Sequence, residues 1–292
     1  MAATALLGLC LISAAQAQIY VANYDGDTIG EYTTAGATVN PSLVTGLIGP
    51  VGLTVSGDDI FVANYYKGDT IGEYTTAGAT VNASLVTGLD YPSGLAVSGG
   101  DIFVANYASG TIGEYTTTGA TVNPSLVTGL NYPNGLAVSG GNIFVAEGNN
   151  TIGEYTTAGA TVNASLVTGL HDPVDLAVSG DDIFVDNGLS GTISEYTTAG
   201  ATVNTSLVTG LIGAYGLAVS GGDIFLAEGG TIGSIGEYTT AGATVNASLV
   251  TGLDGPTGID VGEVPEPSSW GLLAGGLGGW LLWRWRTSRT VV

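Results

Sequence analysis

Residues 94–130 read GLAVSGGDIFVANYASGTIGEYTTTGATVNPSLVTGL, and near-copies of this stretch fill most of the 292-residue chain. The string Glu-Tyr-Thr-Thr marks each copy, and its glutamate recurs at intervals of 40 to 42 residues. The six glutamates are Glu31, Glu73, Glu114, Glu154, Glu195 and Glu237. A fixed period of this length is typical of stacked supersecondary units, none of which can bury its apolar face alone.

Each copy contains four short segments that are rich in β-branched and aromatic residues, which is typical of β-strands. In the copy quoted above they are residues 94–98, 101–106, 111–117 and 125–130. Gly99 and Gly100 predict a two-residue hairpin turn between the first two strands, because glycine accepts the positive φ that such a turn needs. Four strands in about 41 residues predict one blade of a β-propeller.

The two ends of the repeat region predict how the ring closes. Residues 19–23 form a second strand with no first strand before it, and residues 256–261 form a first strand with no second strand after it. Together they complete one blade, so the C-terminal strand closes the ring and removes the exposed sheet edges. We therefore predict an all-β fold, a six-bladed propeller of four-stranded blades over residues 18–262.

The strand sequences resemble NHL-type propeller repeats, whose blades begin Pro-x-Gly-Leu-Ala-Val and continue Ile-Tyr-Val-Ala-Asp. Residues 92–97 and 102–106 fit this pattern, except that Asn or Glu replaces the final Asp. The resemblance covers residues 19–261. It implies a fold rather than an activity, because NHL-like propellers include both enzymes and binding proteins.

The N-terminal end of the chain differs from the repeats. Residues 1–17 resemble a secretory signal peptide, with an apolar run before Ala15-Gln16-Ala17, a cleavage site of the A-x-A type. The only cysteine, Cys10, lies in this segment, so the exported protein needs no disulfide.

The C-terminal end resembles a PEP-CTERM sorting signal. Residues 263–269 form a linker with the motif Pro265, Glu266 and Pro267, and an apolar run and a basic tail follow in residues 270–292. The basic residues of the tail are Arg284, Arg286 and Arg289. The resemblance implies a bacterial envelope protein that an exosortase processes, in a cell that makes extracellular polysaccharide.

An ordinary C-terminal anchor is the alternative. The apolar run has about 16 residues, barely enough for a transmembrane helix, and the arginines favour the cytoplasmic side of the membrane. Under either interpretation the helix holds the protein in the inner membrane at first, and the propeller lies in the envelope or outside the cell.

The propeller is strongly acidic. Lys67 is the only basic residue outside the tail, and against 25 acidic residues it leaves a net charge of −24 once residues 1–17 and 270–292 are excluded. This charge excludes nucleic acid and anionic membrane surfaces as partners. Extracellular polysaccharide or another envelope protein remains as the expected partner.

The copies differ almost only in the loops after the second and fourth strands, which a propeller places on one face. Binding sites gather on loops that a rigid scaffold holds, so we predict the functional site there. These loops contain the tyrosines Tyr24, Tyr65, Tyr66, Tyr91, Tyr107, Tyr132 and Tyr215. Such rings could stack on sugars or anchor a protein partner, and the alternative is that they only cap the blade ends.

The fifth copy is unusual because its strands place Asp175 directly opposite Asp186. Opposed like charges destabilise a sheet unless a cation, solvent or a proton held at raised pKa compensates. We predict a calcium-like site at Asp175 and Asp186, with Asp172 or Glu228 as further ligands. The alternative is a pair of hydrated carboxylates at the rim.

The sequence favours a binding protein over an enzyme. The chain has one histidine, His171, and no P-loop, zinc or dinucleotide motif. The alternative is a calcium-dependent, lactonase-like hydrolase at the central mouth, where the counterparts of the metal ligands would be Asn64, Asn106, Glu147, Asn187 and Glu228. We favour a non-enzymatic module, because copies this similar suit a repetitive surface better than a tuned active site.

Overall fold

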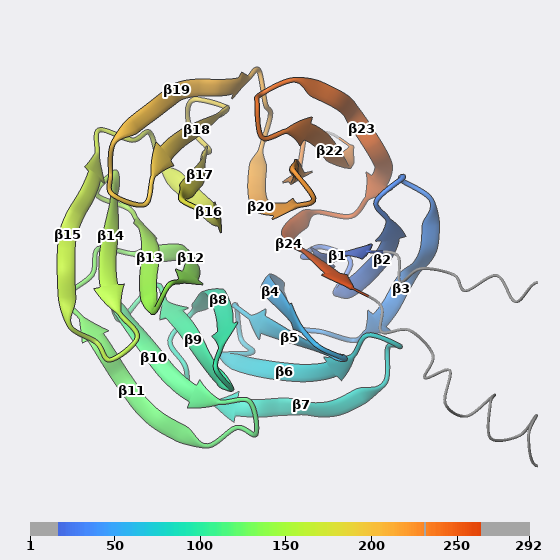
Figure 1. The fold of residues 1–292 in the computed structure, drawn as a ribbon. Coiled ribbons are helices and arrows are strands. Elements are labelled where there is room, and N and C mark those ends of the chain that lie inside the picture. Colours follow the sequence, from blue (N-terminus) through green and yellow to red (C-terminus); the bar gives the residue numbers. More distant parts are fainter. Residues whose placement is uncertain (1–16, 231, 264–292) are drawn as a thin grey trace, which may run out of the picture.

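The computed structural model describes residues 17–230 and 232–263, which form a ring of six four-stranded antiparallel sheets around a central axis (Figure 1). Each sheet is one blade, and its strands run outward from the axis in the order a, b, c, d. In the described part of the chain, no helix is long and apolar enough to cross a membrane. The signal peptide before Ala17, the sorting motif and the C-terminal helix of the sequence analysis lie outside the described residues.

The strands have nearly the same bounds in every blade, as expected from the repeat. The a strands of blades 2–6 are β4 (Pro50–Ser56), β8 (Pro92–Ser98), β12 (Pro133–Ser139), β16 (Pro173–Ser179) and β20 (Ala214–Ser220). The b strands are β1 (Ala17–Asn23), β5 (Asp59–Asn64), β9 (Asp101–Asn106), β13 (Asn142–Glu147), β17 (Asp182–Asn187) and β21 (Asp223–Glu228). The c strands are β2 (Thr28–Thr33), β6 (Thr70–Thr75), β10 (Thr111–Thr116), β14 (Thr151–Thr156), β18 (Thr192–Thr197) and β22 (Gly233–Thr239). The d strands are β3 (Thr38–Thr45), β7 (Thr80–Thr87), β11 (Thr121–Thr128), β15 (Thr161–Thr168), β19 (Thr202–Thr209) and β23 (Thr244–Leu253).

The ring closes in blade 1, as the chain ends predicted. The last strand, β24 (Pro256–Glu263), pairs antiparallel with β1, and Ile19 faces Val261 in the register. The strand order in this blade is β24-β1-β2-β3 (Figure 1). Because β24 covers the inner edge of β1, no blade is left with three strands.

The d strands begin earlier than the sequence analysis predicted. Strand β11 starts at Thr121 rather than at residue 125. The turn before it is tight, since Thr116 donates its N–H to the carbonyl of Ala120 at 2.8 Å and Gly119 takes a φ of +85°. The β-branched residues after this turn are therefore free to pair with strand c.

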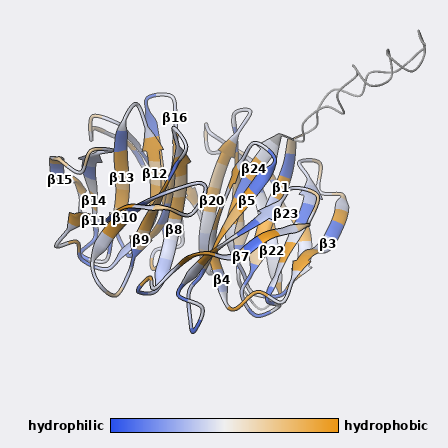
Figure 2. Ribbon diagram, turned by 90° about the horizontal axis from the view of Figure 1, so that it is seen from below, coloured by the Kyte–Doolittle hydropathy of each residue, from blue (hydrophilic) through white to orange (hydrophobic). Residues whose placement is uncertain are grey.

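The core lies between neighbouring blades. Phe103 and Ala105 of strand β9 pack against Leu136, Ile143 and Val145 of the next blade, and equivalent clusters repeat around the ring. The b strands are almost wholly buried because both of their faces are covered, whereas the d strands are exposed over most of their length. Figure 2 shows the resulting alternation of hydrophobic and hydrophilic residues along the strands.

Candidate functional site

The loops on the variable face, defined as the face that carries the b–c and d–a loops, are held by a repeated backbone hydrogen bond. The first residue of each b–c loop donates its N–H to a carbonyl of the d–a loop beside it. Tyr65 donates to Gly49 at 3.0 Å, Tyr107 to Tyr91 at 3.1 Å, and blades 1, 4, 5 and 6 have the same bond. Neighbouring loops of the variable face are therefore linked to one another in every blade.

The side chain that ends each b strand holds the same loops in most blades. Asn64 accepts the N–H of Ile48 at 3.3 Å, and Glu147 accepts the N–H of Asn131 at 2.9 Å. Asn106 and Asn187 make the equivalent bond. The residues considered above as metal ligands of a hydrolase thus serve to hold the loops.

A cavity of about 560 Å³, here called the mouth, opens at the axis on the variable face. Four tyrosines line it: Tyr24, Tyr65, Tyr107 and Tyr215. The second residue of every a strand forms its floor. These residues are Val51, Ser93, Asn134, Val174, Tyr215 and Thr257.

The other predicted tyrosines extend this aromatic surface outward from the mouth. Tyr65 packs edge-on against Tyr91 and Tyr107, with ring centroids 5.1 and 6.2 Å apart. Tyr66 lies 6.3 Å from Tyr91, and Tyr132 lies 5.2 Å from Tyr107. The structure therefore brings five loop tyrosines into one cluster, two of which also line the mouth.

The tyrosines of the b–c loops gather on one side of the mouth. The first position of the b–c loop holds Tyr24, Tyr65 and Tyr107 in blades 1–3, whereas it holds Gly148, Gly188 and Gly229 in blades 4–6. At this position the mouth is thus aromatic in blades 1–3 and glycine in blades 4–6, and the fourth ring, Tyr215, comes from β20 of blade 6 and lies beside Gly229.

Two of the tyrosines occupy an unfavourable backbone conformation. Tyr91 and Tyr132 have φ values of +55° and +47°, and the equivalent positions in blades 2 and 6 are Gly49 and Gly213. A non-glycine residue in this region costs about 1 kcal/mol or more relative to glycine. The backbone conformation at these two positions therefore favours glycine and does not explain why tyrosine is present.

The third residue of each a strand forms a narrow throat beneath the floor. Five of these residues are the glycines Gly52, Gly94, Gly135, Gly216 and Gly258. A Cβ atom at Gly94 would lie 2.4 Å from the carbonyl oxygen of Asn134, so the close approach of the a strands requires glycine. The sixth residue is Asp175, the only one of these six third residues with a side chain. The throat cavity of about 30 Å³ has room for about one water molecule.

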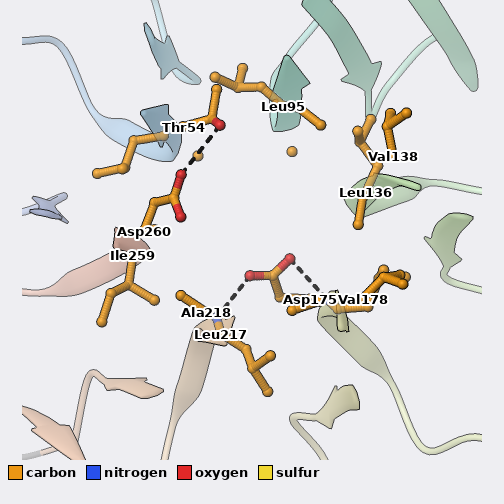
Figure 3. A pocket seen from close by; sticks show the side chains of 18 of the residues that line it. Thr54, Leu95, Leu136, Val138, Asp175, Val178, Leu217, Ala218, Ile259 and Asp260 are labelled. Atoms are coloured by element: carbon orange, nitrogen blue, oxygen red, sulfur yellow. Dashed lines mark hydrogen bonds between the residues drawn. The ribbon is translucent and has the colours of Figure 1, made fainter. Parts of the chain in front are cut away.

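Two carboxylates, Asp175 and Asp260, point into the central channel (Figure 3). Each of them links neighbouring a strands. Asp175 accepts the N–H groups of Leu176 and Leu217, both at 2.9 Å, and Asp260 accepts those of Val55 and Val261, both at 2.8 Å. Burial raises the pKa of Asp175 to about 7, although the two N–H groups oppose the rise.

Asp186 is buried without a hydrogen-bond partner. It faces Asp175 in the register, as predicted. Its side chain is 0% exposed, and neither carboxylate oxygen has a partner. Burial raises its pKa well above the ordinary value, and the nearby Asp175, Glu228 and Asp172 raise it further. The alternative of two hydrated carboxylates at the rim is therefore wrong for Asp186.

The structure does not gather the four residues predicted to bind calcium around one point. Among residues 17–230 and 232–263, no three His, Cys, Asp or Glu side chains lie close enough to hold a metal ion. Asp172 is exposed in a loop, Asp175 already accepts two N–H groups, and Glu228 accepts the hydroxyl of Tyr238 at 3.3 Å. Calcium binding stays a prediction. Asp175 and Asp186 are the opposed carboxylates whose negative charge a cation or a proton would have to offset.

The sequence analysis missed the floor of the mouth and Asp260. A signal for the floor was present, because the residue between Pro and Gly differs in most copies, while Pro and Gly are each replaced only once, by Ala214 and Asp175. Asp260 replaces an alanine found at this position in most copies. Because Asp260 lies on β24, the innermost strand of its blade, this replacement puts a carboxylate in the lining of the central channel.

Residues 263–286 match the PEP-CTERM protein-sorting motif. The chain thus carries the sorting signal of an exported protein that an exosortase processes, and this signal includes a C-terminal membrane anchor. The resemblance seen in the sequence is confirmed at this end of the chain. Comparison with curated proteins finds no significant match.

Solved structures share the propeller fold at low sequence identity. Virginiamycin B lyase from Staphylococcus aureus is 20% identical with a TM-score of 0.61, and the match covers 85% of each chain. A chain of a nidogen/laminin complex is 14% identical with a TM-score of 0.66, over 84% of this chain and 98% of that one. A protein from Desulfotomaculum acetoxidans is 17% identical with a TM-score of 0.60, over 86% and 89%. These likenesses show the fold alone.

Proposed function

We propose that this protein is a non-catalytic binding module of the cell envelope that holds a glycan at the tyrosine-lined mouth. The observation that carries the proposal is the set of four tyrosines that line a cavity of about 560 Å³ on a face whose loops are hydrogen-bonded to one another. Cavities of about 300–1,000 Å³ are typical of sites for small ligands, so the mouth has room for a sugar unit.

The exposed tyrosine rings suit a sugar ligand. Tyr66, Tyr132 and Tyr215 are 47%, 55% and 50% exposed, so their faces are open to stacking. An aromatic ring offers an apolar face and a polar hydroxyl, which match the apolar and polar parts of a sugar. Sorting to the envelope would place this surface beside extracellular polysaccharide. A protein ligand remains the other outcome of the test below.

An enzymatic function has less support from the residues. The b-strand side chains that a lactonase-like site would use are bound to loop N–H groups. In the virginiamycin B lyase of similar fold, replacing one histidine by alanine gives a catalytically inactive enzyme. The single histidine here, His171, lies exposed in a loop and is not among the residues that line the mouth.

The proposal is tested by glycan-array binding of the full-length chain, followed by calorimetry on the best glycan. The double variant Tyr65→Ala/Tyr107→Ala should bind about 30-fold more weakly, because removing a central aromatic anchor costs about 2 kcal/mol or more. The matched control Tyr65→Phe/Tyr107→Phe keeps the rings and should stay within about threefold of the wild type. Unchanged binding by the alanine variant, or chemical turnover of the glycan, would contradict the proposal.

A further inference from the structure

We propose that the mouth selects a ligand with a positively charged group, such as an amino sugar, and that three carboxylates around the mouth and throat provide this selectivity. They are Asp25, Asp172 and Asp175. The inference rests on the proposed function, because it specifies the ligand of the same site.

The charged residues that line the mouth are all acidic. Asp25 and Asp172 lie among its lining residues and are exposed, and no lysine, arginine or histidine in the described chain lines this cavity. The lone lysine of the propeller, Lys67, lies outside the lining, with its Nζ 5.0 Å from the centre of the Tyr66 ring. No cation within the site thus offsets the two carboxylates.

Asp175 adds a third carboxylate in the throat beneath the floor of the mouth. Val174 and Tyr215 line both the mouth and the throat cavity, so the two cavities adjoin. The two N–H groups that Asp175 accepts leave part of its hydrogen-bonding capacity free, because a carboxylate offers about four acceptor positions. The side chain points into the channel (Figure 3). An ammonium group at the floor of the mouth would therefore lie next to the throat that Asp175 lines.

The tyrosines of the mouth and the field of the whole protein favour the same ligand charge. The faces of aromatic rings attract cations, and four tyrosines line the mouth. A cleft lined by charges of one sign concentrates its field on the ligand. The net charge of −24 also opposes anionic glycans such as uronic acids. An amine-bearing glycan can stack on the tyrosines while its ammonium group approaches the carboxylates.

The test compares two probes with the same sugar backbone, the hexamer of glucosamine with free amines and that of N-acetylglucosamine with uncharged amides, by calorimetry on the full-length chain. We expect the glucosamine hexamer to bind at least about tenfold more tightly at low salt, and high salt should reduce this preference because the rim carboxylates are exposed. Both Asp25→Asn/Asp172→Asn and Asp175→Asn should reduce it to below about threefold. The first variant changes only exposed side chains, so it tests the inference even if Asp175→Asn unfolds the protein.

Asp181→Asn is the matched control, because it removes one exposed carboxylate from the turn between β16 and β17 on the opposite face. It should leave the preference unchanged. Equal binding of the two hexamers, lost in the tyrosine-to-alanine variant, would overturn the charge selectivity and leave the proposed function intact. A preference that the Asp25→Asn/Asp172→Asn variant retains would also overturn it, whereas binding of neither hexamer and of no other glycan would overturn both.

Discussion

Replacing Asp186 by alanine should make the protein more stable at neutral pH. Asp186 is fully buried between blades 5 and 6, and its oxygens have no partner. The same position in the other five blades holds a buried alanine: Ala22, Ala63, Ala105, Ala146 and Ala227. An alanine is thus a side chain that this interface already accommodates around the ring.

The size of the effect follows from the cost of burying an unsatisfied polar group, about 1–3 kcal/mol. We expect Asp186→Ala to raise the free energy of unfolding by an amount in this range at pH 8, less the packing contacts that the larger side chain makes. Asp186→Asn should raise the free energy of unfolding by less than Asp186→Ala does, because the amide stays buried without partners.

The stability gained by Asp186→Ala should be larger at high pH than at low pH. Burial raises the pKa of both Asp175 and Asp186 above the ordinary value of 3.8, so the folded protein binds protons more tightly than the unfolded chain. The stability that these groups contribute is full below about pH 4 and is lost as the pH rises through about 7, the folded pKa of Asp175. Each group contributes a slope of up to about 1.4 kcal/mol per pH unit in that window. Without Asp186, the fall in stability between pH 5 and pH 8 should be less steep.

Urea unfolding followed by far-UV circular dichroism, at pH 5 and pH 8, measures both effects. The control Asp181→Ala removes an exposed carboxylate from the same blade and should change stability by no more than about 0.5 kcal/mol. An unfolding midpoint for Asp186→Ala at or below the wild-type value at pH 8 would refute the reasoning. If calcium stabilises the wild type but not this variant, the carboxylate serves a cation instead of holding a proton.

Other predictions follow from the packing around the axis and the loops. Gly94→Ala should lower stability by about 1–3 kcal/mol in urea melts, because its Cβ would lie 2.4 Å from a backbone oxygen, and an unchanged melt would contradict the tight throat. Asn106→Ala should lower the free energy of unfolding by about 1 kcal/mol through loss of its bonds to Asp90 and Thr111. It should also weaken glycan binding, because it releases the loop beside Tyr107. Truncation before Pro256 removes β24 and should abolish cooperative unfolding, whereas truncation after Glu263 should not, as circular dichroism can show.

The repeated sequence by itself determined most of the fold. Strand alternation and glycine turns are local signals that recur in each copy, so they predict the blade and its register. The opposition of Asp175 and Asp186 followed from the position of a single turn. The unpaired strands at the two ends required the ring to close through blade 1.

The tertiary structure decided which residues meet. The floor of the mouth joins residues about 40 positions apart from six different a strands, and their meeting depends on how tightly the closed ring packs around its axis. Asp175 and Asp260 are 85 residues apart, yet both point into one channel. Periodicity within a blade carries no information on such contacts, because they arise from packing between blades. The sequence therefore determined the blades and the variable face, and the closed ring alone brought the tyrosines and carboxylates into one site.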